Sequence, residues 1–280
     1  MIVKLSPAKV NLHLRVLARR ADGFHNICTL MQRIDLCDEM TFTRAERGIN
    51  LRCPGSTVPE DNKNIAYRAA DALLSRLPDP PGISITIKKR IPVAAGLGGG
   101  SSNAATTLIA INEMMGLHLG VHDLMETGKR LGADVPFFIF GKTAWATGIG
   151  ECLHAAQNIP QLWYVLVNPG FEISTRSVYE GLNLRLTKRA VNYKCPQLRS
   201  INGIIKSLRN DLERVTLNLH PVLQHFKNLL VQHGAEGALM TGSGPTVMGI
   251  FRDEEGAIGA EQALKNAGAG EWPVYRASSI

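Results

Sequence analysis

Several features are scarce or missing in this chain of 280 residues, and each absence narrows its possible functions. Aromatic residues make up only 6% of the sequence, and no run of basic residues is longer than Lys88-Lys89-Arg90. Nucleic-acid-binding surfaces combine clustered basic and aromatic side chains, so the composition argues against that class, which we keep as the alternative from outside the enzymes. The net charge of +7 still favours anionic partners such as nucleotides. No apolar run approaches the roughly 18 residues that a membrane span needs, so we expect no membrane partner.

Cysteines are also few, and their spacing forms no recognisable framework. The chain has five, an odd number, and no two of them form a CxxC pair: Cys28, Cys37, Cys53, Cys152 and Cys195. This pattern is typical of reduced thiols and argues against a disulfide framework or a zinc site. The opening segment, MIVKLSPAKVNL, has no apolar core before a small-residue cleavage site, so we expect no secretion signal. Together these observations predict a cytoplasmic protein.

The most informative stretch that is present is glycine-rich and runs from Ile91 to Asn103, IPVAAGLGGGSSN. The alternating run from Ile83 to Ile87 before it predicts a strand, and the apolar periodicity from Ala104 to Met115 after it predicts a helix. Its four glycines, within five residues, let the backbone adopt positive φ and come close to a bulky anion. We expect Ser101, Ser102 or Asn103 to cap the helix, whose unpaired N–H groups would face a phosphate.

The spacing of these glycines excludes the two most familiar phosphate-binding motifs. A Walker A loop needs a Lys followed by Ser or Thr, and no Lys follows the glycines. The dinucleotide fingerprint GxGxxG needs a Gly five positions after Gly96, where this chain has Ser101. The sequence therefore predicts a phosphate-binding loop of another class, with a structural turn as the alternative.

The chain is expected to form two α+β domains. A polar connection with Pro160 lies between His154 and Gln161, and we place the boundary there, with domains of residues 1–156 and 157–280. Strand and helix patterns are mixed in both parts without a steady β-α alternation, which favours the α+β class.

Two charged residues have more than one interpretation on their own. Alternation from Lys9 to Leu14 places Lys9, Asn11 and His13 on one face of a strand, where plain solvent exposure is a sufficient explanation. Asp134 precedes Val135-Pro136-Phe137-Phe138-Ile139-Phe140, so it is either a helix cap or a carboxylate set against an apolar run.

Three stretches, in this order, resemble the GHMP kinase superfamily, whose members phosphorylate small-molecule alcohols with ATP. They are Ser6–Leu12 (SPAKVNL), Pro92–Ala105 (PVAAGLGGGSSNAA) and Thr241–Val247 (TGSGPTV), and the resemblance spans nearly the whole chain. It implies an ATP-binding N-terminal domain similar to domain 2 of ribosomal protein S5. It also implies a ferredoxin-like α+β C-terminal domain.

Further stretches narrow the resemblance to one branch of the superfamily: Arg19–His25, Gly132–Phe138 and Ser174–Tyr179. This branch transfers the ATP γ-phosphoryl group to the 2-hydroxyl of 4-diphosphocytidyl-2-C-methyl-D-erythritol, giving the 2-phosphate and ADP, in the non-mevalonate route to isoprenoid precursors. The implied substrate is thus a small molecule with a cytidyl diphosphate group. A GHMP kinase for another alcohol, such as homoserine or mevalonate, is the alternative among enzymes.

The resemblance also implies roles for individual residues. Asp134 matches the base that accepts the hydroxyl proton, and Lys9 matches the lysine that orients this carboxylate and keeps it ionised. Asn64 resembles a residue on the adenine side, although the start of a helix explains it equally well. The implied ATP-binding loop comprises Pro92, Val93, Ala94, Ala95, Gly96, Leu97, Gly98, Gly99, Gly100, Ser101 and Ser102.

At the cytidyl end, the resemblance implies contacts from Asn11 and His25 and a wall residue at Thr175. Phe24 and Tyr179 match the aromatic pair that encloses the cytosine ring; position 24 is commonly Tyr in the family, so the hydroxyl is lost here. Mg²⁺ is expected beside the phosphates, near Ser101 or Ser102. The residues from Gly242 to Gly244 are expected to form a tight turn beneath the loop.

Overall fold

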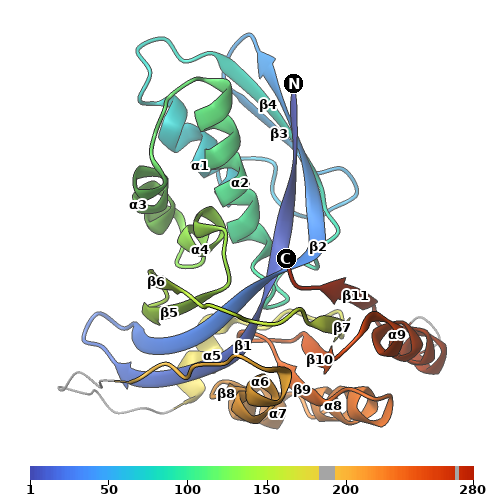
Figure 1. Ribbon diagram of the computed structural model, residues 1–280. Helices are drawn as coiled ribbons and strands as arrows, with labels where there is room; N and C mark the ends of the chain where they lie inside the picture. The colour runs from blue at the N-terminus through green and yellow to red at the C-terminus, as the bar shows by residue number, and fades with distance from the viewer. Residues whose placement is uncertain (183–192, 269–270) are drawn as a thin grey trace. The chain divides into compact units, whose positions relative to one another are not determined.

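The computed structural model describes residues 1–182, 193–268 and 271–280 (Figure 1). The chain forms two compact units, a first unit of Met1–Ala8, Cys37–Val93 and Gly98–Lys142, and a second unit of Lys9–Leu36, Ala94–Leu97 and Thr143–Ile280. The units interleave in sequence because strands β1 (Ile2–Arg19) and β2 (His25–Ala45) each pass through both. The single boundary expected between residues 156 and 157 stays a prediction.

The first unit contains a sheet with the strand order β3-β4-β2-β1. Strand β3 (Ile49–Arg52) runs parallel to β4 (Gly82–Lys88), and β4 runs antiparallel to the second half of β2, with Glu39 opposite Lys88. Alternation along β2 buries Met40 and Phe42 on one face, as expected for a strand with one face on the core. The strand expected at 83–87 is confirmed as β4.

Four helices complete the first unit, and α1 and α2 lie side by side in Figure 1. Their bounds are α1 (Ile65–Leu74), α2 (Gly99–Met114), α3 (Val121–Leu131) and α4 (Val135–Phe140). Gly128 lets α3 and α4 approach closely, because a Cβ there would lie 2.7 Å from Val135 Cγ1. The apolar α4 is buried along almost its whole length, which fixes the position of the residue just before it.

The second unit is built on an antiparallel sheet with the order β11-β7-β10-β9. The strands are β7 (Trp163–Val167), β9 (Gly237–Met240), β10 (Val247–Phe251) and β11 (Val274–Ser278). Helix α8 (Val222–Gln232) packs on β9 and β10, and α9 (Glu254–Gly268) packs on β7 and β11. This order of strands and helices is the ferredoxin-like arrangement that was expected for the C-terminal part.

The second unit also contains shorter elements, and its strands β5, β6 and β8 belong to the other, seven-stranded sheet. Strand β5 (Ala144–Gly148) pairs with β2 and with β6 (Cys152–Ala155), and β8 (Arg209–Asn210) pairs with β1. The remaining helices are α5 (Thr175–Gly181), α6 (Ile201–Ser207) and α7 (Glu213–Leu219). Of the helices in the described ranges, none has both the length and the apolar character that crossing a membrane requires.

Candidate functional site

The middle of the glycine-rich loop, Ala94–Leu97, belongs to the second unit and lies against two other segments of that unit. The backbone N–H of Lys9 on β1 donates to the carbonyl oxygen of Leu97 at 2.9 Å, and Thr246 N donates to Ala95 O at 3.4 Å. Gly96 has φ +77°, and a Cβ at this position would lie 2.4 Å from the carbonyl oxygen of Thr241. The turn from Thr241 to Gly244 therefore lies directly against the loop, as the sequence predicted.

The C-terminal end of the loop belongs to the first unit and leads into α2. This helix begins earlier than expected. Gly98 adopts φ +70° as the N-cap of α2, and the first helical residue is Gly99. The expectation that Ser101, Ser102 or Asn103 caps this helix is wrong, because Ser102 and Asn103 are buried inside its first turns and bond to other segments. Gly98 has no side chain with which to cap α2. The N–H groups of its first turn therefore remain available to an anion.

Asp134 occupies the N-cap position of α4 but does not behave as a cap. It is half-buried, and its carboxylate makes no capping hydrogen bond to the helix. Gly132 brings this segment close to the start of α2, since a Cβ on Gly132 would lie 3.8 Å from Ser101 Oγ. The expected N-cap position is therefore confirmed, but the side chain does not make the capping hydrogen bond, and Asp134 lies in the turn before α4.

Lys9 is not the solvent-exposed residue that alternation on a strand allowed, because only 4% of it is accessible. Its Nζ donates to Asn11 Oδ1 at 2.7 Å. Asn11 is itself held by Thr29 Oγ1, which accepts from Asn11 Nδ2 at 2.8 Å, and by Thr241 Oγ1, which accepts from Asn11 N at 2.9 Å. Asn11 thus orients the ammonium group of Lys9, in addition to any other group that the ammonium contacts.

Lys9 and Asp134 belong to different compact units: Lys9 N donates to Leu97 O within the second unit, and Gly132, two residues before Asp134, lies near Ser101 within the first. That the two residues act together in catalysis stays a prediction.

The residues expected at the cytidyl end lie on β1, β2, α5 and the turn before β2, all in the second unit. The rings of His25 and Tyr179 stack with centroids 5.0 Å apart and an interplanar angle of 29°. Phe24 is 57% exposed, at the end of a turn that Asp22 closes by accepting from Phe24 N at 3.1 Å. Thr175 Oγ1 lies 2.8 Å from Ser243 Oγ, so α5 starts beside the turn that contacts the loop.

The environment of His25 keeps its imidazole neutral near pH 7. Burial lowers the pKa of His25 below its usual 6.5, and the nearby positive charge of Arg19 lowers it further. A neutral imidazole offers one N–H donor and one nitrogen acceptor. That combination suits the hydrogen-bonding edge of a pyrimidine base.

Asn64 is the N-cap of α1. Its Oδ1 accepts from Ala66 N at 2.9 Å, and its Nδ2 donates to Pro59 O at 2.7 Å. The interpretation as a helix start is therefore confirmed, and a contact to adenine stays a prediction.

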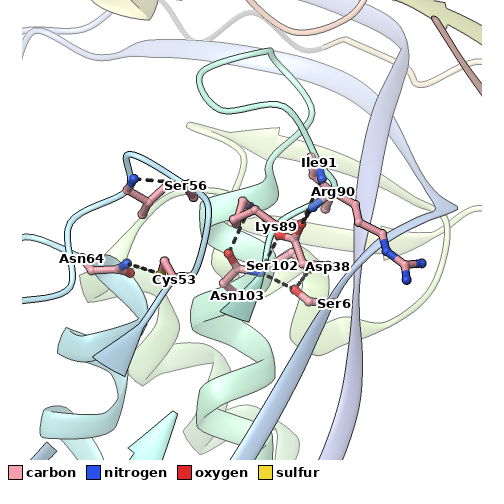
Figure 2. A network of polar contacts seen from close by, with 11 residues as sticks. Ser6, Asp38, Cys53, Ser56, Asn64, Lys89, Arg90, Ile91, Ser102 and Asn103 are labelled. Carbon is pink, nitrogen blue, oxygen red and sulfur yellow. Dashed lines mark hydrogen bonds and ion pairs between the residues drawn. The ribbon is translucent and has the colours of Figure 1, made fainter. Parts of the chain in front are cut away.

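A group of polar residues that sequence reasoning missed surrounds the two ends of the loop (Figure 2). Its centre is Asp38 on β2, which is fully buried and pairs with Lys89. The sequence does contain a signal for it: Asp38 has the same strand parity as the buried Met40 and Phe42, so alternation places a carboxylate on the core face.

Comparison with known proteins agrees with this geometry. Models of the GHMP kinases N terminal domain and the GHMP kinases C terminal domain match residues 64–142 and 189–270. The fold and the loop thus define the class of the GHMP kinases, ATP-dependent enzymes with two domains of mixed helices and sheets.

Individual relatives narrow this class. A protein of Syntrophus aciditrophicus named 4-diphosphocytidyl-2-C-methyl-D-erythritol kinase is 54% identical over 280 residues, covering 100% of both chains. A crystal structure of 4-(cytidine 5'-diphospho)-2C-methyl-D-erythritol kinase has a TM-score of 0.82 and 31% identity over 99% of both chains. A homoserine kinase from Cytophaga hutchinsonii, at 20% identity and a TM-score of 0.73 over 100% of this chain and 94% of its own, shares the fold. The chain belongs to the 4-diphosphocytidyl-2-C-methyl-D-erythritol kinase family.

Proposed function

We propose that this protein transfers the γ-phosphoryl group of ATP to the 2-hydroxyl of 4-diphosphocytidyl-2-C-methyl-D-erythritol, giving the 2-phosphate and ADP in the non-mevalonate route to isoprenoid precursors. The observation that carries the proposal is the hydrogen bond from Lys9 N to Leu97 O, which ties the candidate catalytic lysine to the glycine-rich loop. Membership of a family whose relatives are named for this reaction supports the choice of substrate.

In the proposed reaction, the loop from Pro92 to Ser102 holds the ATP phosphates. The unbonded N–H groups at the start of α2 supply donors and a partial positive charge, both of which favour an anion. Four glycines in this loop keep side chains out of the way of the phosphates.

Asp134 and Lys9 are proposed to be the two catalytic residues. A tertiary hydroxyl has a high pKa, so its proton has to be accepted as the bond to phosphorus forms, and the carboxylate of Asp134 accepts it. The Lys9 ammonium, oriented by Asn11 Oδ1, would stabilise the ionised carboxylate and the charge on the transferring group.

Mg²⁺ fits this site as an ion held largely by ATP. Among the described residues, no three or more His, Cys, Asp or Glu side chains form a metal-binding group. Mg²⁺ in such sites usually keeps several waters and takes one or two protein ligands plus phosphates, which offsets the phosphate charge. Ser102 Oγ is buried and accepts a hydrogen bond from Ser6 Oγ at 2.8 Å, so Ser101 is the better candidate ligand of the two.

The cytidyl group is proposed to bind beside Phe24, His25 and Tyr179. Stacking of a base on an aromatic ring contributes about 1–3 kcal/mol, and Phe24 retains the ring face although it lacks a hydroxyl. Because His25 already stacks on Tyr179, the incoming base has to share that ring with the imidazole or displace it. Thr175 would form part of the wall.

The net positive charge bears on which molecules the protein binds. The protein binds small anionic molecules, and the excess of basic residues steers them to it without implying nucleic acid. We place the reaction in the cytoplasm, where thiols such as the five free cysteines stay reduced.

A turnover panel tests the proposed function. ADP release is measured with ATP, Mg²⁺ and each of four alcohols: the cytidyl diphosphate substrate, 2-C-methyl-D-erythritol without that group, homoserine and mevalonate. We expect ADP release well above the alcohol-free background with the first alone. Comparable turnover of homoserine or mevalonate would favour the alternative kinase. No turnover with any alcohol, together with strongly salt-dependent oligonucleotide binding, would favour the non-enzyme alternative.

A further inference from the structure

A buried carboxylate, that of Asp38, lies at the N-terminal end of the glycine-rich loop. Asp38 is 0% exposed, and its Oδ1 accepts from the backbone N–H groups of Arg90 at 2.7 Å and Ile91 at 2.9 Å. These two residues directly precede the loop. The other oxygen, Oδ2, pairs with the ammonium of Lys89, whose side chain is 10% exposed.

The same carboxylate is also bonded at the C-terminal end of the loop. Asn103, in the first turns of α2, donates from Nδ2 to Asp38 Oδ2 at 2.9 Å and to Ser6 Oγ at 2.9 Å. Ser6 Oγ in turn donates to Ser102 Oγ at 2.8 Å. Figure 2 shows these side chains from β1, β2, the segment before the loop and α2 converging on Asp38. All of them belong to the first unit.

Stability alone is a poor explanation for this arrangement. Removing a carboxylate and an ammonium from water is costly, and buried ion pairs are often matched or exceeded in stability by well-packed apolar residues. Position 38 has the same inward parity as Met40 and Phe42, so an apolar side chain would suit the core there. A fully satisfied polar network instead imposes one geometry on the groups that it joins. Here those groups are the two ends of the loop.

We propose that Asp38 is a positioning residue for the nucleotide: by bonding residues 90, 91 and 103 at once, it holds the loop closed at its base and aims the first-turn N–H groups of α2 at the phosphates. Asp38 does not touch ATP in this proposal; it acts through the backbone and through Asn103. The inference rests on the proposed function of the loop as the ATP site.

The test uses the full chain and the dissociation constant for ATP with Mg²⁺, measured by calorimetry without any alcohol. Asp38→Asn keeps the size of the side chain but removes its charge and turns one acceptor into a donor that faces Asn103 Nδ2 and Lys89. We expect the dissociation constant and the KM for ATP to rise about 10- to 100-fold, while the KM for the cytidyl substrate changes less than twofold. Glu39→Gln is the matched control, because the neighbouring Glu39 forms an exposed ion pair with Lys88 at 2.7 Å. It should leave ATP binding unchanged.

A second variant separates positioning from stability. In Asp38→Asn with Lys89→Met, the unpaired buried ammonium is gone, so much of the lost stability should return, whereas the bonds that position the loop are still impaired. ATP binding that stays weakened in this double variant supports the inference. Recovery of ATP affinity together with thermal stability, or unchanged ATP affinity in Asp38→Asn, overturns it. Failure of the proposed function would instead appear in the unsubstituted protein, as absent ATP binding or absent turnover of the cytidyl substrate.

Discussion

At the scale of single residues, Lys9 and Asp134 are the candidate catalytic groups. The Lys9 ammonium donates to the amide oxygen of Asn11, which orients it. Asp134 sits where a capping carboxylate is common, yet its side chain does not cap α4. A carboxylate that is not committed to a helix end is suited to accept a proton.

Replacing Asp134 with Asn should lower turnover by a factor on the order of 10²–10⁴, the usual effect of losing a general base. Because Asp134 does not cap α4, the fold and ATP binding should be retained. The measurements are kcat for the cytidyl substrate, the ATP dissociation constant and the melting temperature.

Asp123 is a useful control in the same unit, because its Oδ2 accepts from Gly120 N at 3.3 Å and so does cap a helix, α3. Asp123→Asn should affect stability slightly and leave kcat unchanged. If Asp134→Asn turned over at the rate of the unsubstituted protein, Asp134 would not be the base.

At the scale of elements, contacts at its middle and at both of its ends determine the conformation of the glycine-rich loop. Its middle lies against β1 and the turn that begins at Thr241, and its ends are bonded to Asp38. Gly96 is required for the first of these contacts, since both its positive φ and its distance to Thr241 O exclude a side chain. By contrast, Gly100 is helical, and a Cβ there would meet only Ile65 Cγ2 at 3.7 Å.

These differences predict separate effects for two glycine substitutions. Gly96→Ala should destabilise the protein by about 1–3 kcal/mol, the range for a strained backbone position, and weaken ATP binding. Gly100→Ala should keep the melting temperature but still weaken ATP binding, because a methyl group would stand among the N–H groups at the start of α2. Denaturant unfolding and calorimetry with ATP distinguish the two.

Gly259→Ala in α9 provides the reference, since no described residue beyond its own stretch of helix lies within 4 Å of its Cβ position. This substitution should be neutral or slightly stabilising, as Ala favours a helix more than Gly does. A Gly96→Ala protein as stable as the unsubstituted one would show that the loop does not need its observed conformation.

At the scale of the whole molecule, the second unit is assembled from segments far apart in the sequence. Tyr164 on β7 donates to Gln32 on β2, and Ser278 Oγ donates to Asp35 Oδ2 at 2.8 Å. The final residue, Ile280, donates its N–H to Arg33 O at 3.1 Å. The last strand is therefore bonded to residues that precede position 157, which makes the C-terminal half dependent on the N-terminal one.

A fragment of residues 157–280 should consequently lack a cooperative unfolding transition. It would expose the buried face of β7 and lose the β2 partners of Tyr164, Ser278 and Ile280, so we expect helical circular dichroism with binding of a hydrophobic dye. The full chain in the same buffer is the control. A sharp thermal transition of the isolated fragment would show that residues 157–280 fold independently.

Much of this protein was predictable from the sequence, because the relevant information is local. Alternation in 83–87, the helix that starts near Asn64 and the chemistry of the glycines each depend on a few neighbouring residues. The order of three motifs was also sufficient to predict the GHMP kinase class and the ferredoxin-like part.

The tertiary structure decided what depends on distant contacts. Helix α2 starts at Gly99 because Gly98 takes a left-handed conformation while Ser102 and Asn103 bond to Ser6 and Asp38. Likewise, only folding pairs His25 with Tyr179 and shows that Lys9 is buried. Burial and partner choice are set by side chains that come together from separate strands and helices, and no local pattern contains that information.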